Sequence, residues 1–207
     1  RRSVVDDTSM ALPAPGRVDA RAAYRQLQSR LPDLFRPAFE DPLEPRTVVI
    51  VPGLTMDQDV LAKVLGGLHY EERQLTMLML LRLPNTRVVF VSSTPIEPAI
   101  VDYYLGLLPG ISRDDARRRL VLLSASDASA VTLTQKILER PRLLERIRDA
   151  TGDLATAHLS CFNVTALERT LAVRLGIPLY GCDPSLQYIG GKSGSRAAFR
   201  EAGIPLP

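Results

Sequence analysis

The chain has 207 residues, of which 45% are hydrophobic and 24% are charged, and its formal net charge is +3. These values are ordinary for a globular protein that can bury a full core without disulfides or metals. Basic residues are interspersed with acidic ones and Trp is absent, which argues against a nucleic-acid-binding surface.

The cysteines and the apolar runs predict a cytoplasmic protein. Cys161 and Cys182 are too few for a disulfide framework, so we expect a reducing compartment. The basic N-terminus is not followed by the apolar stretch of a signal peptide. The apolar run 76–81 is far too short to cross a bilayer, so no membrane contact is expected.

The first 45 residues are predicted to form an N-terminal arm and a helix. Residues 1–17 are polar and end in a proline-rich segment, which is typical of a loose arm. Apolar spacing predicts a helix over 19–31 that ends at Pro32, and the stretch 35–45 reads as irregular because of its prolines.

Short, continuous apolar runs alternate with helical patterns over residues 46–190. Such runs suit a parallel sheet that is covered on both faces, so we predict a Rossmann-like α/β domain with a doubly wound, mostly parallel sheet of about five strands. The expected strands are 47–51, 87–91, 119–123, 154–162 and 177–180, and the expected helices are 56–66, 70–82, 96–107, 134–150 and 164–175.

Capping signals place helix starts next to strand ends. Thr55, Thr94 and Thr165 each precede a Glu or Gln by three residues, and Ser112 begins an acidic variant of this box. The three threonines follow strands, so their helices should start at the carboxyl edge of the sheet, where open α/β folds bind ligands. We expect caps here, with ligand contacts as the alternative.

Further polar residues follow the strands and outline a crevice at the same edge. Turn chemistry is the alternative explanation for each of them. The predicted substrate-side residues are Ser92, Ser93, Thr94, Asp127, Asn163 and Asp183.

Several familiar sites are missing. The turn after the first predicted strand, Val51-Pro52-Gly53-Leu54-Thr55, lacks the Gly-x-Gly-x-x-Gly fingerprint of a dinucleotide site. His69 and His158 have no metal-ligand partner at useful spacing, so we expect two structural histidines and no metal site.

The C-terminal stretch is the strongest chemical signal. A glycine pair precedes Lys192 at the start of a predicted helix, a natural place to hold phosphate. Lysine is rare here, since only Lys63, Lys136 and Lys192 occur. The stretch is not a P-loop, because Leu186 stands where the motif needs glycine. A P-loop also normally follows the first strand of its domain, whereas this stretch follows the last predicted strand.

Three motifs in order resemble one family. They are His69-Tyr70-Glu71-Glu72-Arg73, Ser93-Thr94-Pro95-Ile96-Glu97-Pro98 with Tyr103-Tyr104-Leu105, and Lys192-Ser193-Gly194-Ser195-Arg196 leading to Ala202-Gly203-Ile204-Pro205. Together they resemble the pre-ATP-grasp domain and domain junction of ATP-grasp carboxylate–amine ligases related to the pheganomycin-type peptide ligase.

The resemblance implies a full-length enzyme that activates a carboxylate as an acyl phosphate for attack by an amine, using ATP and Mg²⁺. Lys192 would contact the ATP phosphates, and Arg196 matches the pattern. Residues 191–207 would begin an ATP-grasp domain whose remaining ATP and magnesium ligands lie further along. The chain alone is then expected to be an inactive fragment with no catalytic residue of its own.

The alternative is a non-catalytic α/β module. It would use the crevice for a small ligand, or the apolar helix 75–83 to form a homodimer. Simple burial of that helix under the sheet is the competing explanation.

Overall fold

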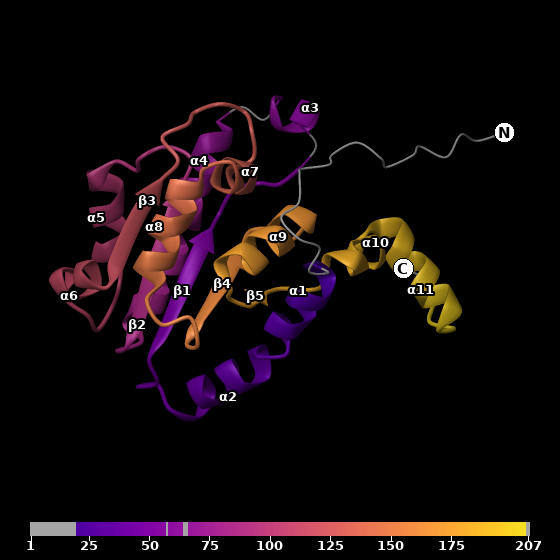
Figure 1. The fold of residues 1–207 in the computed structure, drawn as a ribbon, viewed down its shortest axis with the longest axis horizontal. Helices are drawn as coiled ribbons and strands as arrows, with labels where there is room; N and C mark the ends of the chain where they lie inside the picture. Colours follow the sequence, from indigo (N-terminus) through magenta and orange to yellow (C-terminus); the bar gives the residue numbers. More distant parts are fainter. Residues whose placement is uncertain (1–19, 57, 64–65, 206–207) are drawn as a thin grey trace.

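A parallel five-stranded sheet forms the centre of the computed structural model, which describes residues 20–56, 58–63 and 66–205 (Figure 1). The predicted arm 1–17 lies outside the described residues. Every strand pair is parallel, which confirms the predicted doubly wound α/β fold. The strands are β1 Arg46–Val51, β2 Thr86–Ser92, β3 Leu120–Ser124, β4 Ala157–Cys161 and β5 Leu179–Tyr180. Across the sheet they lie in the order β3-β2-β1-β4-β5.

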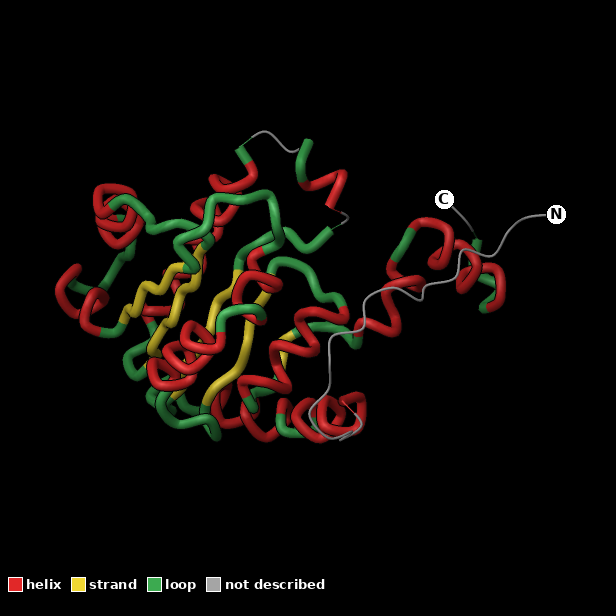
Figure 2. Tube along the Cα trace, turned by 45° about the horizontal axis from the view of Figure 1, so that its top comes forward, coloured by secondary structure: helices red, strands yellow, loops and turns green. Residues whose placement is uncertain are grey.

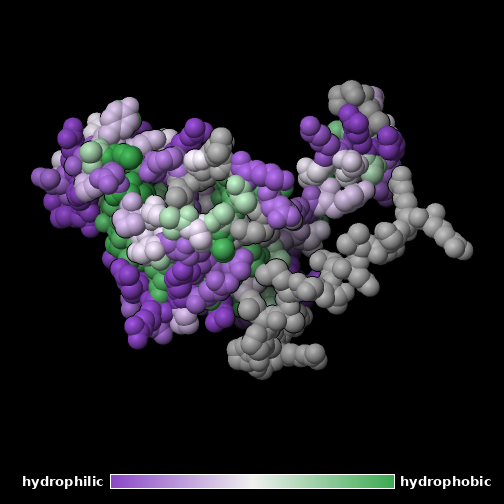
Figure 3. Space-filling model, turned by 90° about the horizontal axis from the view of Figure 1, so that it is seen from above, coloured by the Kyte–Doolittle hydropathy of each residue, from purple (hydrophilic) through white to green (hydrophobic). Residues whose placement is uncertain are grey.

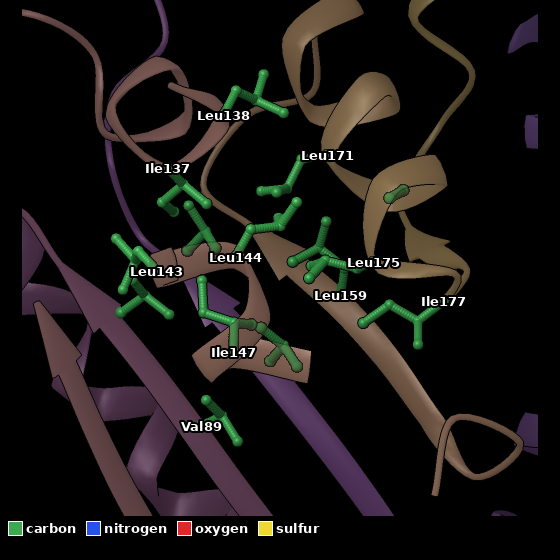
Figure 4. Close-up of a cluster of buried hydrophobic side chains, with 14 of the residues drawn as sticks. Val89, Ile137, Leu138, Leu143, Leu144, Ile147, Leu159, Leu171, Leu175 and Ile177 are labelled. Atoms are coloured by element: carbon green, nitrogen blue, oxygen red, sulfur yellow. The ribbon is translucent and has the colours of Figure 1, made fainter. Parts of the chain in front are cut away.

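Helices cover both faces of the sheet because alternate strand residues point to opposite sides. Val49 and Val51 of β1 join one apolar cluster with α7 (Leu133–Leu138), α8 (Pro141–Thr151) and α9 (Ala166–Leu175). Figure 4 shows this cluster between α8, α9 and the strands. Val48 and Ile50 join the other cluster with η1 (Gln74–Arg82), α5 (Pro98–Gly106) and α6 (Arg113–Arg118).

The predicted helix 70–82 is divided between two helix types. Its first part belongs to α4 (Gly67–Arg73), and the rest is the 3₁₀ helix η1. Three residues per turn bring Leu75, Leu78 and Leu81 onto one face, and all three are fully buried in the core. The sequence analysis offered two explanations for the apolar run 75–83, a dimer interface and burial under the sheet. The buried leucines of η1 agree with burial under the sheet.

Prolines mark helix starts that the sequence analysis misplaced. The stretch 35–45 is not irregular throughout, because α2 spans Leu31–Glu40 with Pro32 in its first turn. Pro32 does not end a helix. It is tolerated in the first turn of α2 because the N–H groups of a first turn have no acceptor within the helix, so the N–H that proline lacks is not needed there. The predicted helix 134–150 is two helices, because Pro141 starts α8.

Two of the four predicted caps are confirmed. Thr165 forms the full reciprocal capping box of α9, and the Ser112 side chain accepts a hydrogen bond at the start of α6. The prediction was wrong for Thr94, because α5 starts only at Pro98 with Glu97 as its N-cap. The Thr55 cap stays a prediction, because residue 57 at the start of α3 lies outside the described residues; the Thr55 hydroxyl donates to Glu168 across the sheet edge.

Helix α1 (Ala20–Gln28) closes the edge of the sheet at β5. The Gln28 side-chain amide donates to the Leu179 carbonyl at 2.9 Å and accepts from the Leu179 N–H at 2.8 Å. The Arg30 guanidinium donates to the carbonyls of Leu154 and Gly176 nearby. One side chain therefore takes the place of a neighbouring strand at an otherwise unpaired edge.

The C-terminal helices form a lobe that stands apart from the main body (Figures 1 and 2). Lys192 begins α11 (Lys192–Glu201), as predicted, after the short helix α10 (Gln187–Gly190). A Cβ at Gly194 would lie 1.9 Å from the Tyr188 carbonyl oxygen, so only glycine permits this contact. Gly203 at φ 67° ends α11 in a Schellman motif. The remaining short helices are α3 (Gln58–Leu61) and η2 (Pro184–Leu186).

His158 is a buried histidine near the start of β4. Its ring packs against Phe35 at a centroid distance of 5.0 Å and against Tyr180 at 6.2 Å. Its Nδ1 has no hydrogen-bond partner among the described residues. Burial and the positive charge of Arg46 lower the pKa of His158 to about 4, so the ring is neutral in the folded protein at neutral pH.

We predict that His158 destabilises the fold as the pH falls from about 6.5, the ordinary histidine pKa, to 4. In this window the unfolded chain takes up a proton that the folded chain excludes, so the free energy of unfolding falls by about 3 kcal/mol in total. Urea unfolding at several pH values measures this loss.

The variant His158→Phe keeps the aromatic packing and should flatten this part of the pH profile. His69→Gln, which changes the exposed second histidine, is the control and should keep it. An unchanged slope in His158→Phe would contradict the assignment.

Candidate functional site

A cavity of about 140 Å³ lies at the carboxyl edge of the sheet, above β1, β2 and β3. The loops after these strands and helices α3, α4 and α7 supply its walls. Figure 3 looks down on this edge, where apolar and weakly polar residues gather between hydrophilic flanks. Its apolar lining includes Leu54, Leu61, Ala128, Val131 and Leu133, and its polar lining includes Glu71, Ser93, Ser129, Thr132 and Lys136.

Glu71 of α4 binds the end of β2. One carboxylate oxygen accepts from the Ser93 N–H at 2.6 Å, and the other accepts from the Ser93 hydroxyl at 2.7 Å. Burial raises the pKa of Glu71, while the two hydrogen bonds and the charge of Lys136 oppose this rise. A buried carboxylate next to a cavity is expected to be paired in this way.

The Lys136 ammonium group joins three segments beneath the cavity. Nζ donates to the Ser93 hydroxyl at 3.1 Å and to the carbonyl oxygens of Asp127 and Ser129 at 2.7 and 2.8 Å. The side chain is 1% exposed. Burial lowers the pKa of Lys136, and the negative charges of Asp127 and Glu71 counteract the effect. All three ammonium protons are therefore used within the protein.

Asp127 holds the loop after β3 in place. Hydrogen bonds from Ser129, assisted by Arg140, lower the pKa of Asp127 to about 2. One carboxylate oxygen accepts from the Ser129 N–H at 2.8 Å, and the other pairs with the Arg140 guanidinium at 2.5 Å. Asp127 is therefore an ionised anchor for the loop rather than a proton donor at neutral pH.

The arrangement is suited to binding and positioning a ligand. Both oxygens of Glu71 and all three protons of Lys136 are already engaged, so these groups fix the cavity wall. Apolar side chains and loop polar groups complete the lining, a mixture that fits a small amphiphilic molecule. Among the described residues no group of three or more His, Cys, Asp or Glu could hold a metal ion.

A second polar cluster lies between β1 and β4, where the order in which the chain adds strands to the sheet reverses. The Asn163 side-chain amide accepts from the Thr55 N–H at 2.9 Å and donates to the Thr55 carbonyl at 2.6 Å. Glu168, which is 1% exposed, accepts from the hydroxyls of Thr55 and Thr165, both at 2.6 Å. This cluster ties the first loop to the start of α9 at the usual ligand position of open α/β sheets.

The predicted site residues fall into three places. Ser92, Ser93, Thr94 and Asp127 lie near the cavity, where Ser93 lines the wall and the buried Ser92 hydroxyl donates to the Thr94 carbonyl. Asn163 belongs to the second cluster. Asp183 caps η2 after β5, and the exposed Lys192 and Arg196 lie on α11 in the separate lobe. The structure does not bring these groups together within this chain.

Sequence reasoning missed Glu71, Lys136, Arg140 and Glu168 as site residues. The scarcity of lysine in an arginine-rich chain was the available signal for Lys136. Glu71 stands in one of the motifs that carry the resemblance, and Glu168 was expected to act as a cap, with a ligand contact as the alternative. Glu71, Lys136 and Glu168 share burial at the sheet edge, which a single sequence does not display.

Comparisons with known proteins relate the chain to a ligase. It is 32% identical over 142 residues, or 66% of its length, to L-propargylglycine--L-glutamate ligase from Streptantibioticus cattleyicolor. It is also 28% identical over 178 residues, or 78% of its length, to IQ motif-containing protein H from Danio rerio. The matches span only 29% and 17% of those proteins.

No family model matches the chain, and no solved structure matches it significantly. No helix in the described part of the chain is both long and apolar enough to cross a membrane. The similarity to L-propargylglycine--L-glutamate ligase supports a ligase-like relationship, which agrees with the resemblance noted in the sequence.

We predict that Lys136 and Glu71 are energetically coupled. Lys136→Met leaves the Glu71 carboxylate buried without its cation and should lower the free energy of unfolding by about 3 kcal/mol. The double variant Glu71→Gln/Lys136→Met should be less destabilised than the sum of the two single variants, by about 1 kcal/mol or more.

Urea unfolding of the four proteins in this cycle measures the coupling. Lys63→Met, at an exposed turn position, is the matched control and should change stability by less than about 0.5 kcal/mol. Strict additivity of Glu71→Gln and Lys136→Met would show that the two groups do not act together.

Proposed function

We propose that the chain is the N-terminal, Rossmann-like part of an ATP-dependent carboxylate–amine ligase. The observation that carries this proposal is its 32% identity to L-propargylglycine--L-glutamate ligase. The parallel sheet and the order of the three motifs are consistent with it. In the longer protein a carboxylate would be activated as an acyl phosphate, an amine would attack its carbonyl carbon, and phosphate would leave.

The cavity at the carboxyl edge would form one wall of the substrate site. Its apolar lining suits the side chain of an amino-acid-like substrate, and the loop anchored by Lys136 and Asp127 keeps the wall in one shape. Fixed walls help catalysis because a reactant that is held in place loses less entropy on reaction. The carboxylate and amine substrates are small molecules in this proposal.

ATP would bind across the junction to an ATP-grasp domain beyond residue 190. Lys192 at the first position of α11 is exposed, and Gly191 before it provides no side-chain cap. The first N–H groups of the helix and the ammonium group therefore suit a phosphate group. Arg196, one turn further on, would add a second positive charge. The ligands for Mg²⁺ would come from the ATP-grasp domain, and this chain alone would be inactive.

A non-catalytic binding module is the second candidate. The chain's match to IQ motif-containing protein H covers more of its length than the ligase match does, at lower identity. In that case the cavity would hold a small ligand without turnover.

We predict that Lys192→Ala lowers ATP-dependent phosphate release by the full-length protein at least tenfold, because the phosphate charge loses a mobile counterion. The assay supplies ATP, Mg²⁺ and pairs of amino acids. Lys63→Ala is the control and should retain full turnover. Undiminished turnover in Lys192→Ala would remove its assigned role, and the absence of turnover with every pair would favour the binding module.

We predict that filling the cavity weakens substrate binding while ATP binding persists. Ala128→Leu and Ala62→Leu add bulk at two sides of the lining and should raise the KM for the amino-acid substrate at least fivefold, with little change in the KM for ATP. Ala99→Leu, on the exposed surface of α5, is the control. Unchanged substrate KM values in both lining variants would place the substrate elsewhere.

A further inference from the structure

The C-terminal lobe is built from two short helices that meet at a sharp bend. Only Gly191 separates α10 from α11, and its N–H donates to the Tyr188 carbonyl at 3.1 Å. Within the described part of the chain, α11 makes no hydrogen bond and no ion pair with the main body, from which the lobe stands apart (Figures 1 and 2). The direction of α11 is therefore set by how it packs against α10.

Gly194 packs directly on the backbone of α10. It is buried, although Lys192 and Ser193 in the same turn of α11 are exposed. A Cβ on Gly194 would lie 2.6 Å from the Tyr188 carbonyl carbon and 3.0 Å from the Ile189 Cα, and closer still to the Tyr188 carbonyl oxygen. All of these are backbone atoms, so no change of rotamer could make room for a side chain.

Gly190, at the end of α10, provides a contrast within the same lobe. A Cβ on Gly190 would meet no atom within 4 Å. Neither Gly190 nor Gly194 has a positive φ, so the backbone conformation requires glycine at neither position. Glycine lowers the stability of a helix relative to alanine. The contact with Tyr188 is therefore what the glycine at position 194 provides.

The packing at Gly194 also determines where Lys192 lies. Lys192 is the first residue of α11 and precedes Gly194 by two residues, so the two share one helical turn. If Gly194 moves away from α10, the backbone of Lys192 moves with it. A Cβ at position 194 would displace α11 by about 1 Å or more, and a misplacement of about 1 Å can cost an enzyme about a hundredfold in rate.

We propose that Gly194 is a positioning residue, which fixes the angle between α10 and α11 and thereby holds Lys192 in place. The angle is a property of this chain alone. Its effect on catalysis rests on the proposed ligase function, in which Lys192 contacts the phosphates of ATP.

Residual dipolar couplings of the backbone amides in the 207-residue chain test the angle. Gly194→Ala should change the direction of α11 relative to α10, while the matched control Gly190→Ala should leave it as in the unaltered chain. Both variants should keep α11 helical, because alanine is a better helix former than glycine. A direction of α11 that is unchanged in Gly194→Ala would overturn the proposal, whether or not the longer protein is a ligase.

Kinetics of the full-length protein test the link to Lys192. Gly194→Ala should lower kcat/KM for ATP by about tenfold or more and keep the KM for the amino-acid substrate within about twofold. Gly190→Ala should change neither. If Gly194 acts through Lys192, Gly194→Ala should cost less than about twofold when position 192 is already alanine.

Two kinetic results would contradict the proposal. They are equal kcat/KM for ATP in Gly194→Ala and Gly190→Ala, and a full further loss when Gly194→Ala is added to Lys192→Ala, which would indicate a general structural role. Absence of turnover in the unaltered full-length protein would instead remove the ligase proposal, and the dipolar couplings would still decide the role of Gly194.

Discussion

The Lys136 ammonium group is the interaction on which the carboxyl edge of the sheet depends. It is the point where the end of β2, the loop after β3 and helix α7 meet, and Glu71 brings α4 to the same point through Ser93. Charged groups are costly to bury unless they are fully paired. The arrangement therefore tolerates few alternatives, and the loop around the adjacent cavity is held in one conformation.

The architecture followed from the sequence, because continuous apolar strands separated by helices have few stable arrangements. The two caps that were confirmed, Ser112 and Thr165, rely on contacts within a few residues. Thr94 has the same local pattern, but its helix begins only at Pro98. Thr55 bonds to Glu168, which is 113 residues away in the chain, and no local rule contains that contact.

The candidate site was predicted in outline and missed in its strongest interactions. Two of the predicted substrate-side residues, Ser93 and Asp127, are part of the anchored wall, and substrate contact by any of the predicted residues stays a prediction. Glu71 and Lys136 lie on helices, where a charged residue usually marks an exposed face, and Arg140 directly precedes α8. Only the packing of α4 and α7 onto the sheet reveals that Glu71 and Lys136 are buried. The roles of Lys192 and Arg196 in binding the phosphates of ATP remain predictions.

The hydrogen bonds between Gln28 and Leu179 have a consequence for how the domain can be divided. Although α1 precedes β1 by almost twenty residues, its glutamine completes the last strand of the sheet. A chain trimmed to begin at β1 would leave β5 with free N–H and carbonyl groups, and two such edges could pair across molecules into a continuous sheet. Helix α1 thus covers the outer edge of β5, and it belongs to the same folding unit as the strands.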